Sequence, residues 1–283
     1  MVLLLCPLVE FKQSIETAQK VAGHLKSLGV RCIADDLLES ILGSACGIEY
    51  LTKQQAEQQC DYVVAIGGDG TILRVAQRAI ALDKPMFGIN TGRVGFLAAF
   101  DVKNLESITP SAIEELSEET RLLLDFSLKS TPGRHYYAVN DIVVSKSNET
   151  NTIEVDLEYG RYSVGRICAD GVIVSTPTGS TAYSLSAGGP IVAPMVDAVI
   201  ITPVCSHSLF SRSFVLGTHS TVSIAPSGRT NNRGHILVDG VNVGPLERDD
   251  CVIIKGSEKR LRLLRSEKRN FYDILNREIS EKD

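Results

Sequence analysis

A glycine-rich loop after an apolar segment is the first part of this sequence whose residue types could bind a ligand or catalyse a reaction. Residues 62–66 are continuously apolar, and Gly67-Gly68-Asp69-Gly70-Thr71 follow them directly. A buried strand that ends in glycines and opens a helix brings backbone N–H groups and the positive end of the helix dipole together, and the glycines let a ligand approach closely. We therefore predict that Gly67, Gly68, Gly70 and Thr71 bind phosphate.

The loop differs from the two best-known phosphate-binding fingerprints. The sequence has no Gly-Lys pair for G-x-x-x-x-G-K-[ST], and a G-x-G-x-x-G pattern that starts at Gly68 meets Leu73 at its last glycine. A carboxylate near a phosphate is unfavourable unless it acts on an acceptor hydroxyl or near a metal-bound triphosphate. Asp69 is therefore either a general base for a sugar hydroxyl or the cap of the following helix. The loop alone leaves both interpretations open.

A second segment, residues 169–184, is rich in hydroxyl groups. It combines an apolar strand, a turn fixed by Pro177 and a run of Ser and Thr side chains. Hydroxyls at a turn that enters a helix can bind a ribose or a base edge, Tyr183 offers a ring for stacking, and Asp170 can accept hydrogen bonds from ribose hydroxyls. The structural alternative is a turn that bonds only to its own backbone, which explains part of the segment but not all of it.

Taken together, the two segments resemble the NAD kinase family, a relative of phosphofructokinases and diacylglycerol kinases. The G-G-D-G-T loop is shared with lipid and sugar kinases, whereas T-P-T-G-S-T-A-Y-S after D-G is specific to this family. The resemblance runs through nearly the whole chain. The matching segments are Gly67–Thr71, Asn90–Leu97, Asn140-Asp141, Asp170–Ser186 continuing to Pro190, and Pro203–Leu209.

The resemblance implies a phosphotransferase that moves a phosphoryl group from ATP, or another donor, to the 2′-hydroxyl of the adenosine ribose of NAD and so forms NADP. It implies that Asp69 is the catalytic acid–base residue and that Mg²⁺ is held mainly by the triphosphate, with no metal site made by the protein. The implied NAD-binding residues are Asp69, Gly70, Arg74, Asn140, Asp141, Asn151, Asp170, Thr178, Thr181, Ala182, Tyr183, Ser184, Leu185 and Ser186. For Arg74, a surface position is an equal alternative to a phosphate contact.

Three positions differ from the family pattern. Asp141 stands where Glu is common, Cys168 stands where a basic residue often precedes the second motif, and Val241 stands where Gln frequently follows a late turn. The nearest cation to Asp170 along that segment is Arg166. Two alternatives remain beside the leading hypothesis: a related kinase for a lipid or sugar, and an NAD-binding regulatory module that has lost turnover.

The elements that must position these segments fall into two regions. In the first hundred residues, apolar segments such as 2–6, 30–34 and 62–66 alternate with helical periodicity at 14–28 and 71–82. This pattern predicts an α/β domain with a doubly wound, Rossmann-like parallel sheet. After about residue 120, short strands and turn signals follow one another, which predicts a β-rich, sandwich-like domain.

We predict that residues 1–100 and 265–283 form the α/β phosphate-binding domain and that residues 101–264 form the β-rich NAD-binding domain. An amphipathic helix at 271–279 is expected to return to the first domain. Residues 51–59 are predicted as a helix and residues 136–146 as one strand. Residues 251–255 and 260–264 are predicted as two strands, and Asp239-Gly240 is a strong signal for a two-residue hairpin turn.

Composition limits the partners and the environment of the protein. The 283 residues carry a formal net charge of -5, which argues against a nucleic-acid partner. The seven cysteines have no metal-ligand spacing, which predicts buried thiols in a reducing compartment. No apolar run approaches the ~20 residues of a membrane span, and the apolar start lacks the basic region of a secretion signal. We predict a cytoplasmic protein with no membrane partner that forms a homo-oligomer, a dimer or tetramer, through strand edges.

Overall fold

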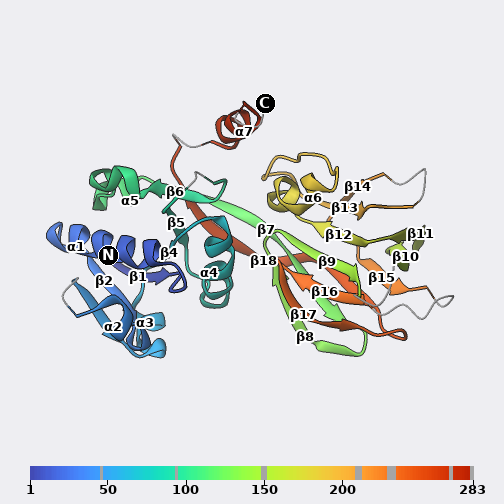
Figure 1. The fold of residues 1–283 in the computed structure, drawn as a ribbon, viewed down its shortest axis with the longest axis horizontal. Helices are drawn as coiled ribbons and strands as arrows, with labels where there is room; N and C mark the ends of the chain where they lie inside the picture. The colour runs from blue at the N-terminus through green and yellow to red at the C-terminus, as the bar shows by residue number, and fades with distance from the viewer. Residues whose placement is uncertain are drawn as a thin grey trace. The chain divides into compact units, whose positions relative to one another are not determined.

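A computed structural model of the protein describes residues 1–44, 47–92, 95–147, 152–207, 212–227, 234–267 and 270–280 (Figure 1). Contacts within the chain define two units. The first consists of Met1–Thr120 and Leu261–Asp283, and the second of Arg121–Arg260. The predicted first boundary was residue 100. The first unit extends further because Ile108 and Ile113 are buried in the same core as the first helix.

A parallel sheet forms the centre of the first unit. Its strands are β1 (Val2–Pro7), β2 (Arg31–Asp35), β3 (Ile48–Leu51), β4 (Tyr62–Ile66), β5 (Met86–Asn90) and β6 (Ala98–Asp101). Its helices are α1 (Lys12–Ser27), η1 (Asp36–Leu38), α2 (Glu39–Leu42), α3 (Lys53–Gln59), α4 (Asp69–Leu82), η2 (Val102–Ser107), α5 (Pro110–Glu114) and α7 (Phe271–Ser280). Successive residues of β1 from Leu3 to Leu5 are all buried, so both faces of the sheet are covered.

The strand order places the glycine loop at a reversal in the sheet. The order is β3-β2-β1-β4-β5, and β6 pairs with β5. The chain therefore proceeds outward in opposite directions from the neighbouring strands β1 and β4. In sheets of this kind ligands bind at the carboxyl ends of the strands where the order reverses. The loop of residues 67–71 follows β4 at that point, and the predicted doubly wound α/β fold is confirmed.

Strand β3 was not predicted, and the helix predicted at 51–59 begins later than expected. Thr52 forms a capping box with Gln55: the Gln55 N–H donates to Thr52 Oγ1 at 3.4 Å, and the Thr52 N–H donates to Gln55 Oε1 at 3.2 Å. Helix α3 therefore begins at Lys53. The residues before it are free to pair with β2 as a short parallel strand.

The second unit is a sandwich of two antiparallel sheets. The first consists of β11-β10-β15-β18, with β7 beside β18 and β8 beside β7, and it is continuous with the parallel strands because β18 also pairs with β5. The second has the order β14-β13-β12-β9-β16-β17. Their strands are β7 (Ser117–Leu128), β8 (Thr131–Ala138), β9 (Asp141–Lys146), β10 (Ile153–Tyr159), β11 (Tyr162–Ala169), β12 (Gly171–Ser175), β13 (Ala198–Val204), β14 (Phe214–Gly217), β15 (Val222–Pro226), β16 (Gly234–Val238), β17 (Val241–Leu246) and β18 (Val252–Arg265). The short helices η3 (Thr178–Thr181) and α6 (Tyr183–Ser186) follow β12.

The core of this unit lies between the two sheets. Phe126, Val155 and Ile254 from the first sheet and Val144 and Val174 from the second are all buried in one apolar cluster. This arrangement confirms the predicted sandwich. Strands β7 and β18 each contribute residues to both units, and the last helix, α7, belongs to the first unit as predicted.

Two strand predictions in the second unit were wrong. The predicted strand 136–146 is interrupted, because β8 ends at Ala138 and β9 begins at Asp141. The predicted strands 251–255 and 260–264 are instead one long strand, β18. The predicted hairpin is confirmed: Asp239 and Gly240 have φ of 47° and 79°, as a type I′ turn requires.

The cysteines differ in their exposure. Cys6, Cys32 and Cys60 are buried free thiols, as predicted, but Cys205 is exposed because it lies beyond the end of β13. Cys46 lies outside the described residues. Among the helices that the structure describes, none is long and apolar enough to span a membrane.

Candidate active site

The glycines of the loop between β4 and α4 differ in whether packing requires a residue without a side chain. Gly67 has φ of +156°, and a Cβ atom there would overlap the Thr71 side chain, so packing requires this glycine. Gly68 and Gly70 are exposed, and the space around a Cβ at either position is empty. The fold itself does not demand glycine at these two positions. Their small size leaves the backbone open to a ligand.

The first turn of α4 faces this open space. Gly68 is the N-cap residue, and its carbonyl oxygen accepts hydrogen bonds from the N–H groups of Thr71 at 2.9 Å and Ile72 at 3.1 Å. The first N–H groups of a helix have no partner within the helix, and they lie at the positive end of its dipole. An exposed first turn with two glycines is therefore a suitable place for a phosphate group.

Asp69 is held by a different part of the chain. Its carboxylate accepts hydrogen bonds from the backbone N–H of Phe96 at 2.7 Å and of Leu97 at 3.2 Å. A Cβ atom at Gly95 would overlap the same carboxylate, so the glycine makes room for it. Because Gly68 occupies the N-cap position, the alternative in which Asp69 caps α4 is wrong. The carboxylate is half-buried and fixed beside the open loop.

Arg74 lies one turn further along α4 and is exposed. Its guanidinium forms an ion pair with Glu10, with 3.1 Å between Nη1 and Oε1. Asn151, which the family resemblance implies as an NAD-binding residue, lies outside the described residues, as do Arg93 and Val94 of the matching stretch 90–97.

In the second unit, Val139 and Asn140 connect β8 to β9, and Asp141 is the first residue of β9; we refer to these three residues as the loop of residues 139–141, and their backbone is hydrogen-bonded on both sides. The N–H groups of Val139, Asn140 and Asp141 donate to the Asp239 carboxylate at 2.9, 2.7 and 3.1 Å. The carbonyl oxygens of Val139 and Asn140 accept from the Thr176 hydroxyl at 2.6 Å and the Thr176 N–H at 2.8 Å. These bonds replace strand pairing, which is why the predicted strand 136–146 is interrupted here.

The side chains of this loop differ in exposure. The Asn140 carboxamide is half-exposed, and within the described part of the chain it has no hydrogen-bond partner. Asp141 is buried, and this burial, together with the negative charge of Asp239, raises the pKa of Asp141 to about 7. Burial also raises the pKa of Asp239, against the opposing effect of its three N–H bonds. Near neutral pH Asp141 can therefore act as a hydrogen-bond donor as well as an acceptor.

The second motif packs directly against this loop. A Cβ atom at Gly179 would overlap the backbone of Asn140, so the two segments are in close contact. Thr178 is buried, and its hydroxyl has no hydrogen-bond partner among the described residues. A buried hydroxyl without a hydrogen-bond partner is unfavourable. In a binding site, the ligand can supply the missing hydrogen bond.

The remaining predicted residues of the second motif differ in their accessibility to solvent. Thr181 and Ala182 are half-buried, and Tyr183, Leu185 and Ser186 are exposed. The Thr181 hydroxyl donates to the Thr178 carbonyl oxygen at 3.3 Å. Ser184 is fully buried, and its hydroxyl lies 3.0 Å from that of Thr202 inside the unit. Tyr183 is 48% exposed, so part of this residue is accessible to a ligand.

Lys146 is a polar neighbour of the motif that the sequence reasoning missed. Its ammonium group donates to Asp170 Oδ1 at 2.8 Å, and both side chains are about one-third exposed. Arg166, the cation that the sequence placed nearest to Asp170, instead pairs with Asp156 at 2.9 Å. The pairing of β9 with β12, in which Ser145 lies opposite Gly171, places Lys146 beside Asp170.

Comparisons with known proteins agree with this geometry. Family models match in two parts: the ATP-NAD kinase N-terminal domain over residues 8–119 and the ATP-NAD kinase C-terminal domain over residues 139–266. The NAD kinase of Sulfurimonas denitrificans is 32% identical over 272 residues, which cover 95% of this chain and 92% of that protein. The NAD kinase of Desulforamulus reducens is 35% identical over 246 residues, which cover 86% of this chain and 85% of that protein.

Solved structures show the same architecture. Yeast NADH kinase in complex with NADH has a TM-score of 0.81 at 26% sequence identity, over 97% of this chain and 86% of that one. An NAD kinase from Archaeoglobus fulgidus in complex with ATP has a TM-score of 0.73 at 27% identity, over 97% and 96%. The α/β unit with a parallel sheet and the β-sandwich together form the fold that this chain shares with these nucleotide kinases. This chain belongs to the NAD kinase family.

Proposed function

We propose that this protein is an NAD kinase, which transfers the γ-phosphoryl group of ATP to the 2′-hydroxyl of the adenosine ribose of NAD. The observation that carries the proposal is the Asp69 carboxylate. It does not cap α4 but is fixed by the N–H groups of Phe96 and Leu97 beside an open glycine loop. An ionised carboxylate in that position is suited to act as a general base in phosphoryl transfer.

The proposed reaction assigns a role to residues of each unit. Asp69 accepts the proton of the 2′-hydroxyl as its oxygen forms a bond to the γ-phosphorus, while the bond from that phosphorus to the β,γ-bridging oxygen breaks and ADP leaves. The exposed N–H groups of the glycine loop bind phosphate oxygens. Asn140, Asp170 and the unpartnered Thr178 hydroxyl hold the dinucleotide, so that its ribose is oriented for transfer.

A divalent metal fits this site as part of the nucleotide. Among the described residues, no group of three or more His, Cys, Asp or Glu side chains is placed to hold a metal ion. Asp69 is the one carboxylate that we assign to the phosphate loop, and both of its oxygens already accept backbone hydrogen bonds. We therefore propose that Mg²⁺ is bound mainly by the triphosphate, where it neutralises the charge of the phosphates.

The test is an acceptor assay on the purified protein with ATP and Mg²⁺. NAD is expected to be converted to NADP, whereas lipid and sugar acceptors are expected to stay unmodified. Asp69→Asn keeps the size of the side chain and removes the base, so turnover should fall by about 10² to 10⁴-fold. Asp36→Asn, at an exposed aspartate in η1, is the matched control and should keep full activity.

Other outcomes of this assay would point to the alternatives. Undiminished turnover of Asp69→Asn would contradict the assigned role of Asp69. Phosphorylation of a lipid or sugar in place of NAD would support the related kinases. Binding of NAD by calorimetry without any NADP formation would support a regulatory module.

We also propose that the protein forms a homo-oligomer. Strand β14 is at the edge of its sheet and carries the exposed apolar side chains of Phe214 and Val215. An exposed apolar edge strand is a common place for pairing between subunits. Light scattering that shows the mass of a single chain at assay concentrations would contradict this proposal.

A further inference from the structure

Asp239 lies in a hairpin turn, and its side chain does more than the turn requires. The turn between β16 and β17 needs positive φ at two successive residues, and Asn-Gly satisfies that requirement as well as Asp-Gly does. An Asn at this position would form the turn without a charged side chain. The Asp239 side chain is instead half-buried, and the partial loss of water around its carboxylate raises its pKa and makes its charge unfavourable. The turn alone therefore gives no reason for an aspartate.

The reason lies in the neighbouring loop of residues 139–141. Oδ1 of Asp239 accepts from the N–H groups of Asn140 at 2.7 Å and Asp141 at 3.1 Å, and Oδ2 accepts from the N–H of Val139 at 2.9 Å. The Asp239 N–H in turn donates to the Asp141 carbonyl oxygen at 2.9 Å. These three N–H donors need a hydrogen-bond acceptor at both terminal atoms of the side chain. A carboxylate provides them, whereas an Asn side chain would point its own NH₂ group at one of the donors.

The opposite side of the loop is equally constrained. Thr176 bonds to the carbonyl oxygens of Val139 and Asn140, and Gly179 packs against the Asn140 backbone. The backbone of the loop is therefore held by contacts on both sides. The Asn140 carboxamide is then the polar group that it presents for an external ligand.

We infer that Asp239 is a positioning residue for dinucleotide binding, which fixes the loop of residues 139–141 so that the Asn140 carboxamide points at the ribose or base of NAD. The inference rests on the proposed function, because it takes NAD as the ligand of Asn140. Asp239 acts through the loop and does not itself need to touch the ligand.

The test compares steady-state constants for both substrates. Asp239→Asn keeps the turn but places an NH₂ group against one of the backbone N–H donors. Asp239→Gly keeps the turn and removes the side chain. In both variants the KM for NAD should rise by about 10-fold or more, since small displacements of a positioning group weaken binding strongly. The KM for ATP should stay within about twofold, because the phosphate loop belongs to the other unit. Asp249→Asn, at an exposed aspartate after β17, is the control and should change neither constant.

The outcomes separate this inference from the proposed function. If the wild-type protein forms no NADP, the proposed function fails before any variant is measured. If the wild type is active and both Asp239 variants keep the wild-type KM for NAD, the inference is overturned, even if kcat falls, because a purely structural role lowers only the amount of active enzyme. If one variant does not fold, the KM of the other decides.

Discussion

The two loops that carry the candidate functional residues, one in each unit, are built in different ways. The glycine loop of the first unit is defined by consecutive residues, 67–71, at the end of a buried strand. The loop of residues 139–141 in the second unit takes its conformation from Asp239, which is 98 to 100 positions away in the sequence. The first loop can be recognised from its own residues, whereas the second depends on a partner that only the folded chain brings to it. Substitutions should therefore act locally in the first case and through distant partners in the second.

The first prediction tests whether the catalytic geometry of the glycine loop is as local as its sequence. Gly95→Ala places a Cβ atom where the Asp69 carboxylate lies, and the carboxylate is the end of a side chain that can rotate away. We expect the variant to fold and its kcat to fall by about 10² to 10³-fold, because the base is displaced from the acceptor hydroxyl. Steady-state kinetics with ATP and NAD measure this loss.

Gly92→Ala is the matched control for that substitution. Gly92 lies in the same segment after β5, but the space around a Cβ there is empty. The control should keep activity within about twofold of the wild type. Full activity of Gly95→Ala would show that the position of Asp69 does not limit turnover.

The second prediction concerns Asp141, the buried carboxyl group of the other loop. Burial and the charge of Asp239 raise the pKa of Asp141 to about 7, well above its ordinary value. The folded protein therefore binds more protons than the unfolded chain between about pH 4 and 7. The free energy of unfolding should fall as the pH rises through this range, with Asp141 contributing about 2 to 3 kcal/mol of the change. Denaturant unfolding at a series of pH values measures it.

Asp141→Asn separates this contribution from the other titrating groups. The amide has nearly the shape of the neutral acid and does not titrate, so the variant should lose less stability between pH 5 and pH 8 than the wild type. At pH 8 it should be the more stable of the two. If the two proteins show parallel pH dependence, Asp141 does not titrate in this range.

The difference between the loops also explains what the sequence could predict. The β4–loop–α4 segment was found from an apolar run, the glycines and helical periodicity, all within residues 62–82. The break in the predicted strand 136–146 could not be found in this way, because those residues are apolar enough for a strand and the competing acceptor is Asp239. Lys146 was missed for a related reason: its contact with Asp170 depends on the register of β9 against β12.

The family resemblance supplied the list of binding residues but not their environments. Ser184 was predicted as an NAD-binding residue, yet its hydroxyl is buried against Thr202. Its exposure depends on how α6 packs, with Ser184 against Thr202 of β13, which no local pattern encodes. Asp69 is the reverse case. Its local sequence favoured a helix cap and a base equally; the structure excludes the cap, because Gly68 is the N-cap residue and the carboxylate binds the N–H groups of Phe96 and Leu97, and the base is our proposal.

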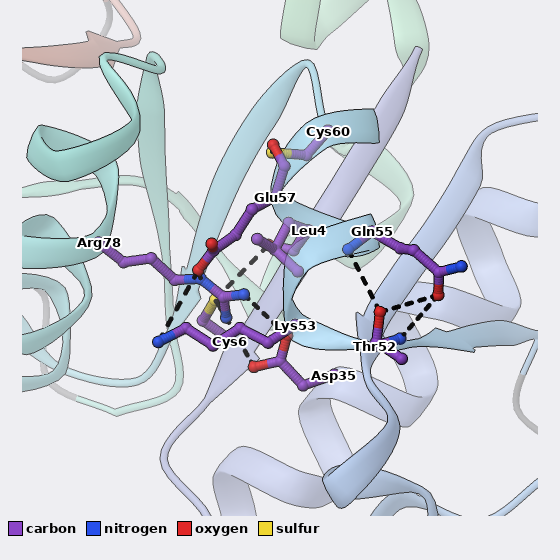
Figure 2. Close-up of polar contacts among 9 residues, drawn as sticks. All are labelled: Leu4, Cys6, Asp35, Thr52, Lys53, Gln55, Glu57, Cys60 and Arg78. Atoms are coloured by element: carbon purple, nitrogen blue, oxygen red, sulfur yellow. Dashed lines mark hydrogen bonds and ion pairs between the residues drawn. The ribbon is translucent and has the colours of Figure 1, made fainter.

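The third prediction tests whether distant partners matter for stability in the first unit as well. Figure 2 shows Arg78 of α4 reaching Asp35 at the end of β2 and Glu57 of α3, with distances of 2.7 and 3.0 Å. These side chains are only about one-fifth exposed, so Arg78→Met would leave the Asp35 carboxylate poorly solvated without its bidentate partner, and Glu57 with the longer 4.0 Å pair to Lys53. We expect the free energy of unfolding to fall by about 2 kcal/mol. Urea unfolding followed by circular dichroism measures it.

The control for Arg78 is another bidentate arginine of the same unit. Arg31 pairs with Glu49 at 2.7 Å, but both side chains are more than 40% exposed. Arg31→Met should lower the free energy of unfolding by less than about 1 kcal/mol, because water compensates for the lost contact. Equal losses in the two variants would show that burial does not strengthen the Arg78 network.

The smallest expected effect concerns the cation beside the second motif. Lys146 pairs with Asp170 and Arg166 pairs with Asp156, and all four side chains are about 35 to 50% exposed. An ion pair this exposed contributes little, so Lys146→Met should raise the KM for NAD by only about threefold, through looser placement of Asp170. Arg166→Met removes an equally exposed pair that does not involve the motif, and it should leave this KM unchanged. If Arg166→Met raised the KM as much as Lys146→Met, the effect would come from the loss of positive charge near the site. The contact with Asp170 would then have no part in binding.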